Sequence, residues 1–212
     1  MKQGSEFEVA DFFTRSDGRY VFARWNRPMA PVVFGAADET VAVVRAAISA
    51  MTAMTGMPLV DTDPELGANM MWFFLRDWEE LLDTPDLDRL IPDLAALVQR
   101  LEQASANQYR IFRFDPEGGI RACFVFIRMD EHLADVPADT LALGQSIQSV
   151  LLWSDEAFLG GSPLAIVADG GPAVIRPEIA DIVRAAYAAG MPPAATDPSH
   201  ALRLQARLPR AI

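Results

Sequence analysis

The sequence predicts a single mixed α+β domain rather than a regular series of β–α–β units. Strand-like and helical stretches follow one another in an irregular order, and the clearest local unit is a β-hairpin followed directly by a long helix. A chain of 212 residues suits one domain. We expect the domain to span residues 19–191, after a lead-in of residues 1–18 and before a loose tail of residues 192–212 that is rich in proline and alanine.

Composition excludes several classes of protein. Apolar residues make up 51% of the chain, which is enough for a sizeable core. The formal net charge of −11 disfavours a nucleic-acid-binding protein, which needs a basic surface, and also disfavours adhesion to anionic lipid. No run of roughly 18 apolar residues is present, so the sequence predicts no transmembrane segment.

A single cysteine, Cys123, rules out an internal disulfide and a thiolate metal site. It lies within an apolar run and is expected to be a small core residue. The stretch Gly4 to Phe7 is typical of a cloning junction, which leaves open that a native signal peptide has been removed. The compartment is therefore not predicted from composition.

The first half of the chain is predicted to contain two strands and a long helix. Arg19 to Trp25 and Pro31 to Phe34 are typical of strands, and we expect them to form a hairpin or to lie side by side. From Asp38 to Thr55, apolar residues recur at spacings of three and four, which predicts an amphipathic helix. Gly56 is expected to end it in the left-handed conformation.

The middle of the chain combines a buried strand with an acidic helical section. Asn69 to Leu75 is an almost continuous apolar run, which predicts a strand covered on both faces. The section from Asp77 to Ala106 is divided into short helices by Pro85 and Pro92. It is expected to be a helical layer of the domain, or a lid over the sheet.

A hairpin and a central helix follow. Tyr109 to Phe114 and Ile120 to Arg128 are predicted strands joined by a turn rich in proline and glycine. The next predicted element is a long helix from Pro137 to Asp155. A strand from Leu164 to Ala168 and a helix that begins at Pro177 complete the domain.

One group of residues has the chemistry of metal ligands or of acid–base catalysts. These are Asp130, Glu131, His132 and Asp135, whose carboxylate and imidazole groups could bind a divalent metal or transfer protons. Adjacent residues seldom converge on one ion, so the first expectation is a solvated loop without metal or cofactor. The alternative is a hydrolase of another class that uses this cluster. His200 is assigned no role, and the four tryptophans are expected in or near the core.

Short motifs distributed from Arg19 to Met191 resemble a bacterial family. They are Arg24-Trp25 with Pro28, Thr55-Gly56, Ala68-Asn69 before a strand, and Asp181, Tyr187 and Gly190-Met191 near the end. The chain thereby resembles the domain-of-unknown-function family 2927, whose layout is similar to that of zincins. Zincins are peptidases that carry H-E-x-x-H on a helix, where two histidines bind zinc and the glutamate acts as a base. The resemblance implies a small twisted sheet and a central helix after the hairpin.

The resemblance places a degenerate site on the central helix. The family pattern E-x-x-Q-x-L-G-L followed by N-D puts Gln145 at the glutamate position and Gln148 at the glutamine position. Ser154 and Asp155 take the asparagine and aspartate positions. Leu151 stands where the pattern has glycine, and Gly144 stands at the place of a first histidine. None of these side chains supplies the ligand or base that zinc peptidases need.

Three interpretations follow from this degenerate motif. The first is a catalytically inactive, zincin-like domain with a binding or structural role, whose remnant cleft at Gln145, Gln148, Ser154 and Asp155 binds a peptide or a protein partner. The second is an ordinary amphipathic helix whose glutamines face water. The third is an interaction subunit that uses the acidic section 77–106 as its contact face. The family resemblance favours the bacterial periplasm or envelope.

Overall fold

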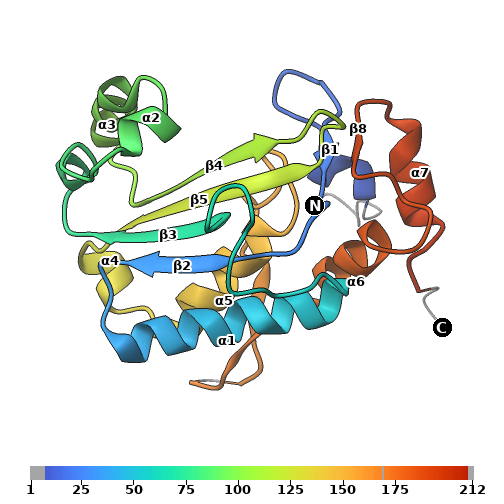
Figure 1. Ribbon diagram of the computed structural model, residues 1–212. Coiled ribbons are helices and arrows are strands. Elements are labelled where there is room, and N and C mark those ends of the chain that lie inside the picture. Colours follow the sequence, from blue (N-terminus) through green and yellow to red (C-terminus); the bar gives the residue numbers. More distant parts are fainter. Residues whose placement is uncertain (1–7, 169, 210–212) are drawn as a thin grey trace.

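A four-stranded mixed sheet lies at the centre of the computed structural model, which describes residues 8–168 and 170–209 (Figure 1). In spatial order its strands are β2 (Pro31–Phe34), β3 (Met70–Leu75), β5 (Ile120–Arg128) and β4 (Gln108–Phe114). The first three strands are parallel, and β4 pairs antiparallel with β5. The domain is therefore of the α+β class, as the sequence predicts, and β4 is an edge strand.

Strands β3 and β5 are covered on both faces because both of their faces are apolar. On β3, Met70 and Trp72 belong to the main core, whereas Met71, Phe73 and Leu75 face a second core on the other side of the sheet. Successive side chains of a strand alternate between faces, so a continuous apolar run needs a cover on each side. The predicted strand and its double burial are confirmed.

Helices α1 (Asp38–Thr55) and α5 (Ala138–Ser149) cover the first face and pack against each other. They lie below the sheet in Figure 1. The predicted bounds of α1 are confirmed, and Gly56 follows it with a φ of 71°, the left-handed conformation that favours glycine. Helix α5 follows the β4–β5 hairpin after the short helix α4 (Glu131–Ala134).

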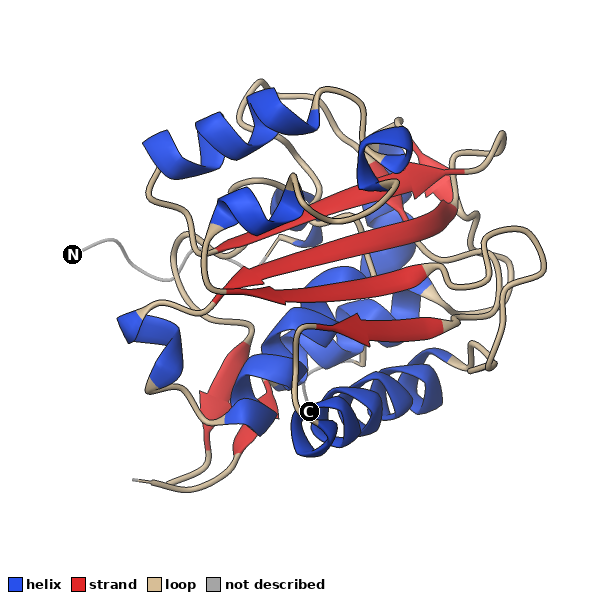
Figure 2. Cartoon of the chain, turned by 60° about the vertical axis from the view of Figure 1, so that its left-hand side comes forward, coloured by secondary structure: helices blue, strands red, loops and turns tan. Residues whose placement is uncertain are grey.

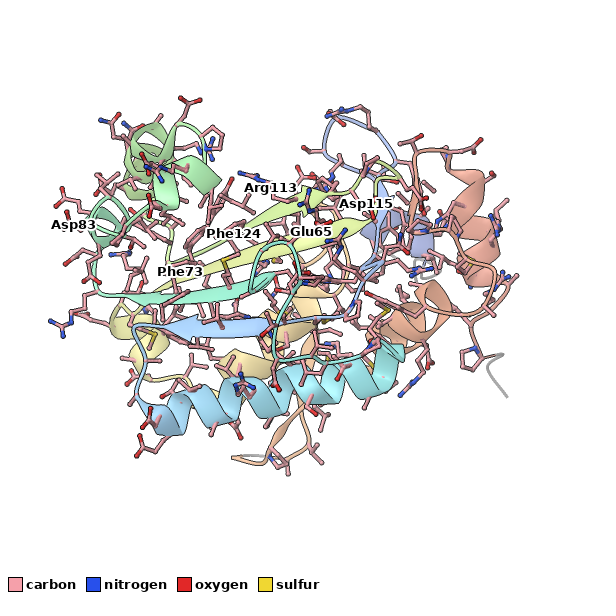
Figure 3. All side chains as sticks on the ribbon, in the orientation of Figure 1. Glu65, Phe73, Asp83, Arg113, Asp115 and Phe124 are labelled. Atoms are coloured by element: carbon pink, nitrogen blue, oxygen red, sulfur yellow. The ribbon has the colours of Figure 1, made fainter. Side chains whose placement is uncertain are left out.

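The acidic helical section covers the second face. It contains the 3₁₀-helix η2 (Trp78–Leu81) and the helices α2 (Leu87–Leu90) and α3 (Leu94–Gln103). Its buried leucines join Phe73 and Phe124 in the second core; Figure 3 labels both phenylalanines. The view in Figure 2 shows helices on both sides of the sheet. The section is thus part of the packed domain and buries its own apolar side.

The strand pairing near the N-terminus differs from the prediction. Only Phe22–Ala23 forms a strand (β1), and it pairs antiparallel with β8 (Ala194–Ala195) instead of with β2. A second two-stranded ribbon joins β6 (Leu164–Ile166) to β7 (Ala173–Ile175). The partner of β1 lies at the far end of the chain, so local sequence patterns could not reveal it.

Both ends of the described chain are packed, in contrast to the expected loose tail. Helix α7 (Ser199–Gln205) contacts α6 (Pro177–Ala186) and the N-terminal 3₁₀-helix η1 (Val9–Phe12). The Phe13 ring stacks on Trp153 with 5.6 Å between centroids. The lead-in and the tail therefore complete one core.

The cloning-junction stretch, residues 4–7, lies outside the described residues.

His200 is part of this terminal core. Its Nδ1 lies 2.8 Å from Tyr20 Oη, and its ring centroid lies 4.2 Å from that of Phe22. Burial is the main cause that lowers the pKa of His200 to about 4, and the positive charges of Arg203 and Arg207 contribute to this lowering. His200 is therefore held neutral in the folded protein.

Within residues 8–168 and 170–209, none of the helices has the length and apolar character to cross a bilayer.

The packed tail predicts different costs for two leucines of α7. Leu204 is fully buried, so Leu204→Ala is expected to lower the free energy of unfolding by about 2–5 kcal/mol, measured by urea denaturation. Leu202 is 72% exposed, and Leu202→Ala on the same helix is expected to change it by less than about 0.5 kcal/mol. Equal effects of the two substitutions would contradict the packing of α7.

Burial of His200 also predicts a pH dependence of stability. The folded-state pKa of about 4 lies below the ordinary value of 6.5, so the unfolded chain takes up a proton first as the pH falls. The free energy of unfolding should therefore decrease from pH 6.5 toward pH 4. In His200→Gln the decrease over this range should be smaller, as measured by urea denaturation at each pH. An unchanged slope would show that other groups cause it.

Candidate functional site: an arginine held by two glutamines beside the edge strand

Helix α5 ends at Ser149, six residues before the predicted end at Asp155. Three side chains donate hydrogen bonds to carbonyl groups at its end, two from distant parts of the sequence and one from the segment that follows the helix. Trp25 Nε1 donates to Ser149 O at 2.8 Å, Trp153 Nε1 to Ile147 O at 3.0 Å, and Tyr187 Oη to Val150 O at 2.6 Å. With these carbonyls satisfied, the chain leaves the helix at little cost.

The chain after α5 is held by backbone hydrogen bonds. Leu152 N donates to Ala23 O at 2.9 Å, and Ser154 N donates to Phe12 O at 2.7 Å. These contacts hold residues 150–155 in a non-helical path beside β4. The early end of α5 thereby places Ser154 and Asp155 next to the helix instead of on it.

Arg110 of β4 lies against α5 and is held by two glutamines. Its Nη1 donates to Gln145 Oε1 at 2.6 Å, and its Nη2 donates to Gln148 Oε1 at 2.7 Å. Gln145 is buried, and its Nε2 donates to Gln108 Oε1. Gln148 Nε2 donates to Gly144 O at 3.1 Å. Both amide oxygens are thus directed at the guanidinium, which fixes its position.

The Arg110 guanidinium carries a charge that no carboxylate neutralises directly. In the part of the chain that the structure describes, Arg110 forms no ion pair within 4.0 Å. Burial lowers its pKa below the ordinary value, although an arginine remains protonated in proteins. Burial also raises the pKa of the Cys123 thiol to about 12, an effect that the Arg110 charge partly offsets. Cys123 is fully buried and neutral, as expected for a core residue.

A cavity of about 550 Å³ opens beside this arginine. The strand β4 forms one wall, the segment from Gln148 to Leu159 forms another, and Arg15 reaches it from the N-terminal loop. The lining side chains are Arg15, Gln108, Tyr109, Arg110, Phe112, Gln148, Leu152, Trp153, Ser154, Asp155, Phe158 and Leu159. The cavity therefore combines two cationic groups with apolar and aromatic walls.

Ser154 and Asp155 connect the cavity to the N-terminal loop. Ser154 Oγ donates to Thr14 O at 2.6 Å. Asp155 accepts hydrogen bonds from the side chain and the backbone N–H of Ser16, which hold the pKa of its carboxyl below the ordinary value. Asp155 is therefore ionised at neutral pH and already engaged, so it is poorly placed to act as a general base.

The outer edge of β4 presents backbone groups that are not paired with β5, although the Phe112 carbonyl accepts a hydrogen bond from Arg113 Nη1 at 3.5 Å. Arg128 N donates to Asn107 O at 2.8 Å, which makes these two residues a hydrogen-bonded pair of the ladder. Alternation along an antiparallel ladder then turns the backbone N–H and C=O groups of Gln108, Arg110 and Phe112 away from β5. Among the described residues, no further strand pairs with this edge.

A second cavity, of about 640 Å³, lies on the other face of β4. It is lined by Tyr109, Ile111 and Arg113 of β4 and by residues of the helical section that include Arg89 and Arg100. Arg113 Nη2 donates to Leu90 O at 2.9 Å and its guanidinium lies 5.9 Å from the Phe124 ring centroid; Figure 3 labels Arg113 and Phe124. Both faces of the edge strand therefore border a cavity that contains arginine.

The structure gives the proposed remnant cleft a definite arrangement. Gln148, Ser154 and Asp155 line one cavity, and Gln145 lies directly behind it on the same arginine. The glutamines do not face open solvent, which differs from the interpretation of α5 as an ordinary amphipathic helix with outward glutamines. Arg110 is the member of this site that sequence reasoning missed. The alternating pattern of Tyr109 to Phe114 placed it on one face of a predicted strand, but did not reveal what that face contacts.

The acidic cluster is not brought into this site. Asp130 caps α4 by accepting from Leu133 N at 2.9 Å, and it also accepts from Asn107 Nδ2 at 3.0 Å. Glu131, His132 and Asp135 are exposed. None of the four lines the cavity beside Arg110. These four residues form a capped, solvated turn, and their positions do not suggest acid–base catalysis.

The residues at the helix positions that correspond to the zinc motif in the resemblance do not suit a metal. The atoms available there as metal ligands are the amide oxygens of Gln145 and Gln148. Both already accept hydrogen bonds from the Arg110 guanidinium, whose positive charge lies between them. Zinc prefers imidazole, thiolate and carboxylate ligands. Across residues 8–168 and 170–209, no group of three or more His, Cys, Asp or Glu side chains is arranged to hold a metal ion.

The hydrogen bonds of Gln145 predict a cost for its removal. In Gln145→Leu, Arg110 Nη1 and Gln108 Oε1 each lose a partner in a largely buried place, so the free energy of unfolding should fall by roughly 1–3 kcal/mol. Gln103→Leu changes an exposed glutamine on α3 and should stay within about 0.5 kcal/mol of the wild type. Urea denaturation measures both. Similar values for the two variants would show that the amide network contributes little.

The chain matches no known family model, no curated protein and no solved structure. Its site is therefore interpreted from its own geometry.

Proposed function

We propose that this chain is a catalytically inactive domain of zincin-like layout that binds a peptide in extended conformation along the edge of β4. The relationship to the domain-of-unknown-function family 2927 is part of this proposal. The position of α5 supports it: the helix follows the β4–β5 hairpin and lies under the sheet, in the order that the resemblance implies.

One observation supports the proposed lack of metal-dependent catalysis. Arg110 donates to both Gln145 and Gln148, the residues at the positions of the degenerate helix motif. A guanidinium at this place repels a divalent cation, and the amide groups that hold it are neither metal ligands of the usual kind nor bases at neutral pH. The same residues form one wall of a binding cavity.

The edge of β4 explains why the ligand would be an extended peptide. Outward N–H and C=O groups at Gln108, Arg110 and Phe112 form a template for an added strand. The side chains of such a strand alternate in direction, and cavities lie on both faces of β4 to receive them. Main-chain hydrogen bonds would provide affinity, and the cavities would provide selectivity.

A second copy of the chain is a poorer occupant of this edge than a peptide from another protein. Antiparallel pairing of β4 with β4 of another copy in the register centred on Arg110 would place the two Arg110 residues directly opposite each other. Like charges in close cross-strand positions are destabilising. Repulsion between the two Arg110 residues would therefore disfavour this pairing relative to a peptide from a different partner.

Removing one outward N–H tests the proposal. A phage-displayed library of random heptapeptides is selected on the immobilised full chain, and an enriched peptide is synthesised for calorimetric titration. Phe112→Ala and Phe112→Pro remove the same ring, but only proline removes the backbone N–H. We expect the peptide to bind Phe112→Pro roughly tenfold more weakly than Phe112→Ala, since one hydrogen bond contributes about 1 kcal/mol and proline also alters the strand edge.

Two further measurements complete this test. Thermal unfolding of both variants establishes that each is folded, and titration in the presence of EDTA should give the same affinity because no metal takes part. Failure to enrich any peptide, or equal binding by the two variants, would count against strand addition at β4. Loss of binding in EDTA would count against the metal-free site.

A further inference from the structure

The cavity beside α5 contains a cation that is placed as a receptor for an anion. We propose that Arg110 is the anchor of a carboxylate-binding site that takes a carboxylate attached to an apolar group. This rests on the proposed function for the identity of the ligand as a peptide. The carboxylate itself is recognised by the arginine and its surroundings.

The way in which Arg110 is held leaves its charge available. Structural arginines in partly buried places are usually balanced by a carboxylate, and this chain has 29 acidic residues against 18 basic ones. Arg110 is held instead by the neutral amides of Gln145 and Gln148. Neutral acceptors orient the guanidinium without cancelling its charge, and its remaining N–H groups have no protein acceptor among the described residues.

A fixed guanidinium suits a carboxylate for two reasons. Its planar set of donors matches the two oxygens of a carboxylate, and such charge-assisted pairs are stronger than neutral hydrogen bonds. Orientation by two short hydrogen bonds, of 2.6 Å and 2.7 Å, also means that little side-chain freedom is lost when the ligand binds. The partly buried position of Arg110 reduces the screening of its charge by water.

The rest of the cavity restricts where the carboxylate can lie and what it is attached to. Arg15 adds a second positive charge, whereas ionised Asp155 repels an anion from the end that is bonded to Ser16. The walls contain Phe112, Leu152, Trp153 and Phe158, which favour an apolar group next to the carboxylate. A peptide that ends in a hydrophobic residue has this chemistry, and so does an acidic side chain beside a hydrophobic one.

Three synthetic peptides of equal length distinguish these sources. The first is acetyl-tetraalanyl-leucine with a free carboxylate, the second is its C-terminal amide, and the third is the amide with aspartate at the third position. We expect the free acid or the aspartate peptide to bind at least roughly tenfold more tightly than the plain amide in calorimetric titration, as is typical of a hydrogen bond to a charged group. Which of the two binds more tightly identifies the source of the carboxylate.

Substitutions at Arg110 test the residue itself. In Arg110→Gln the preference for the charged peptides should disappear, and in Arg110→Lys it should be reduced because the charge remains but the paired donors are lost. Arg45→Gln makes the same change of charge at an exposed residue of α1 and should keep the full preference. Thermal unfolding of each variant controls for misfolding. Retention of the preference in Arg110→Gln would overturn the assignment.

A small-molecule probe separates this inference from the proposed function. Isocaproate and its amide are titrated into the wild-type chain while the Nε–Hε correlations of the arginine side chains are recorded by NMR. A saturable shift with isocaproate alone, absent in Arg110→Gln, supports the carboxylate site even if no peptide binds. Peptide binding with no preference for a carboxylate, and no shift with isocaproate, would overturn the site and leave strand addition at β4 in place.

Discussion

The burial of both faces of β3 and β5 is the constraint on which the rest of the structure depends. Trp72 and Val125 face the core beneath α1 and α5, whereas Phe73 and Phe126 face the core beneath the helical section. Two covers are needed because alternate side chains on both strands are apolar. With both faces closed, the accessible part of this end of the sheet is the outer edge of β4, and the cavities flank that edge.

The site beside this edge is organised by the cost of burying a charge. Arg110 projects from β4 toward α5 and is partly buried there, and this burial lowers the pKa of its guanidinium below the ordinary value. Gln145 and Gln148 offset the cost of this burial with two short hydrogen bonds, and they do so without supplying a negative charge. One physical requirement thus accounts for two observations: the orientation of Gln145 and Gln148 toward Arg110, and a cation that borders the cavity.

The interpretation as a binding domain follows from the same arrangement. Asp155 is tied to Ser16, and Asp130 caps α4, so the carboxylates singled out from the sequence serve local structure. In the proposed mode of binding, a partner would be recognised by the outward backbone groups of β4 and by the Arg110 N–H groups that the two glutamines do not use. The proposed strand addition and the proposed carboxylate recognition are two parts of a single mode of binding.

Local patterns in the sequence determined the α+β class, helix α1, the strand β3 and the β4–β5 hairpin, because each has an apolar period or a turn signal of its own. They also drew attention to Gln145, Gln148, Ser154 and Asp155. Only the tertiary structure decided where α5 ends, because Trp25 and Tyr187 donate to carbonyls at its end from distant parts of the sequence. It likewise decided that the tail packs and that the central helix presents its glutamines to Arg110, since those contacts join residues far apart in the chain.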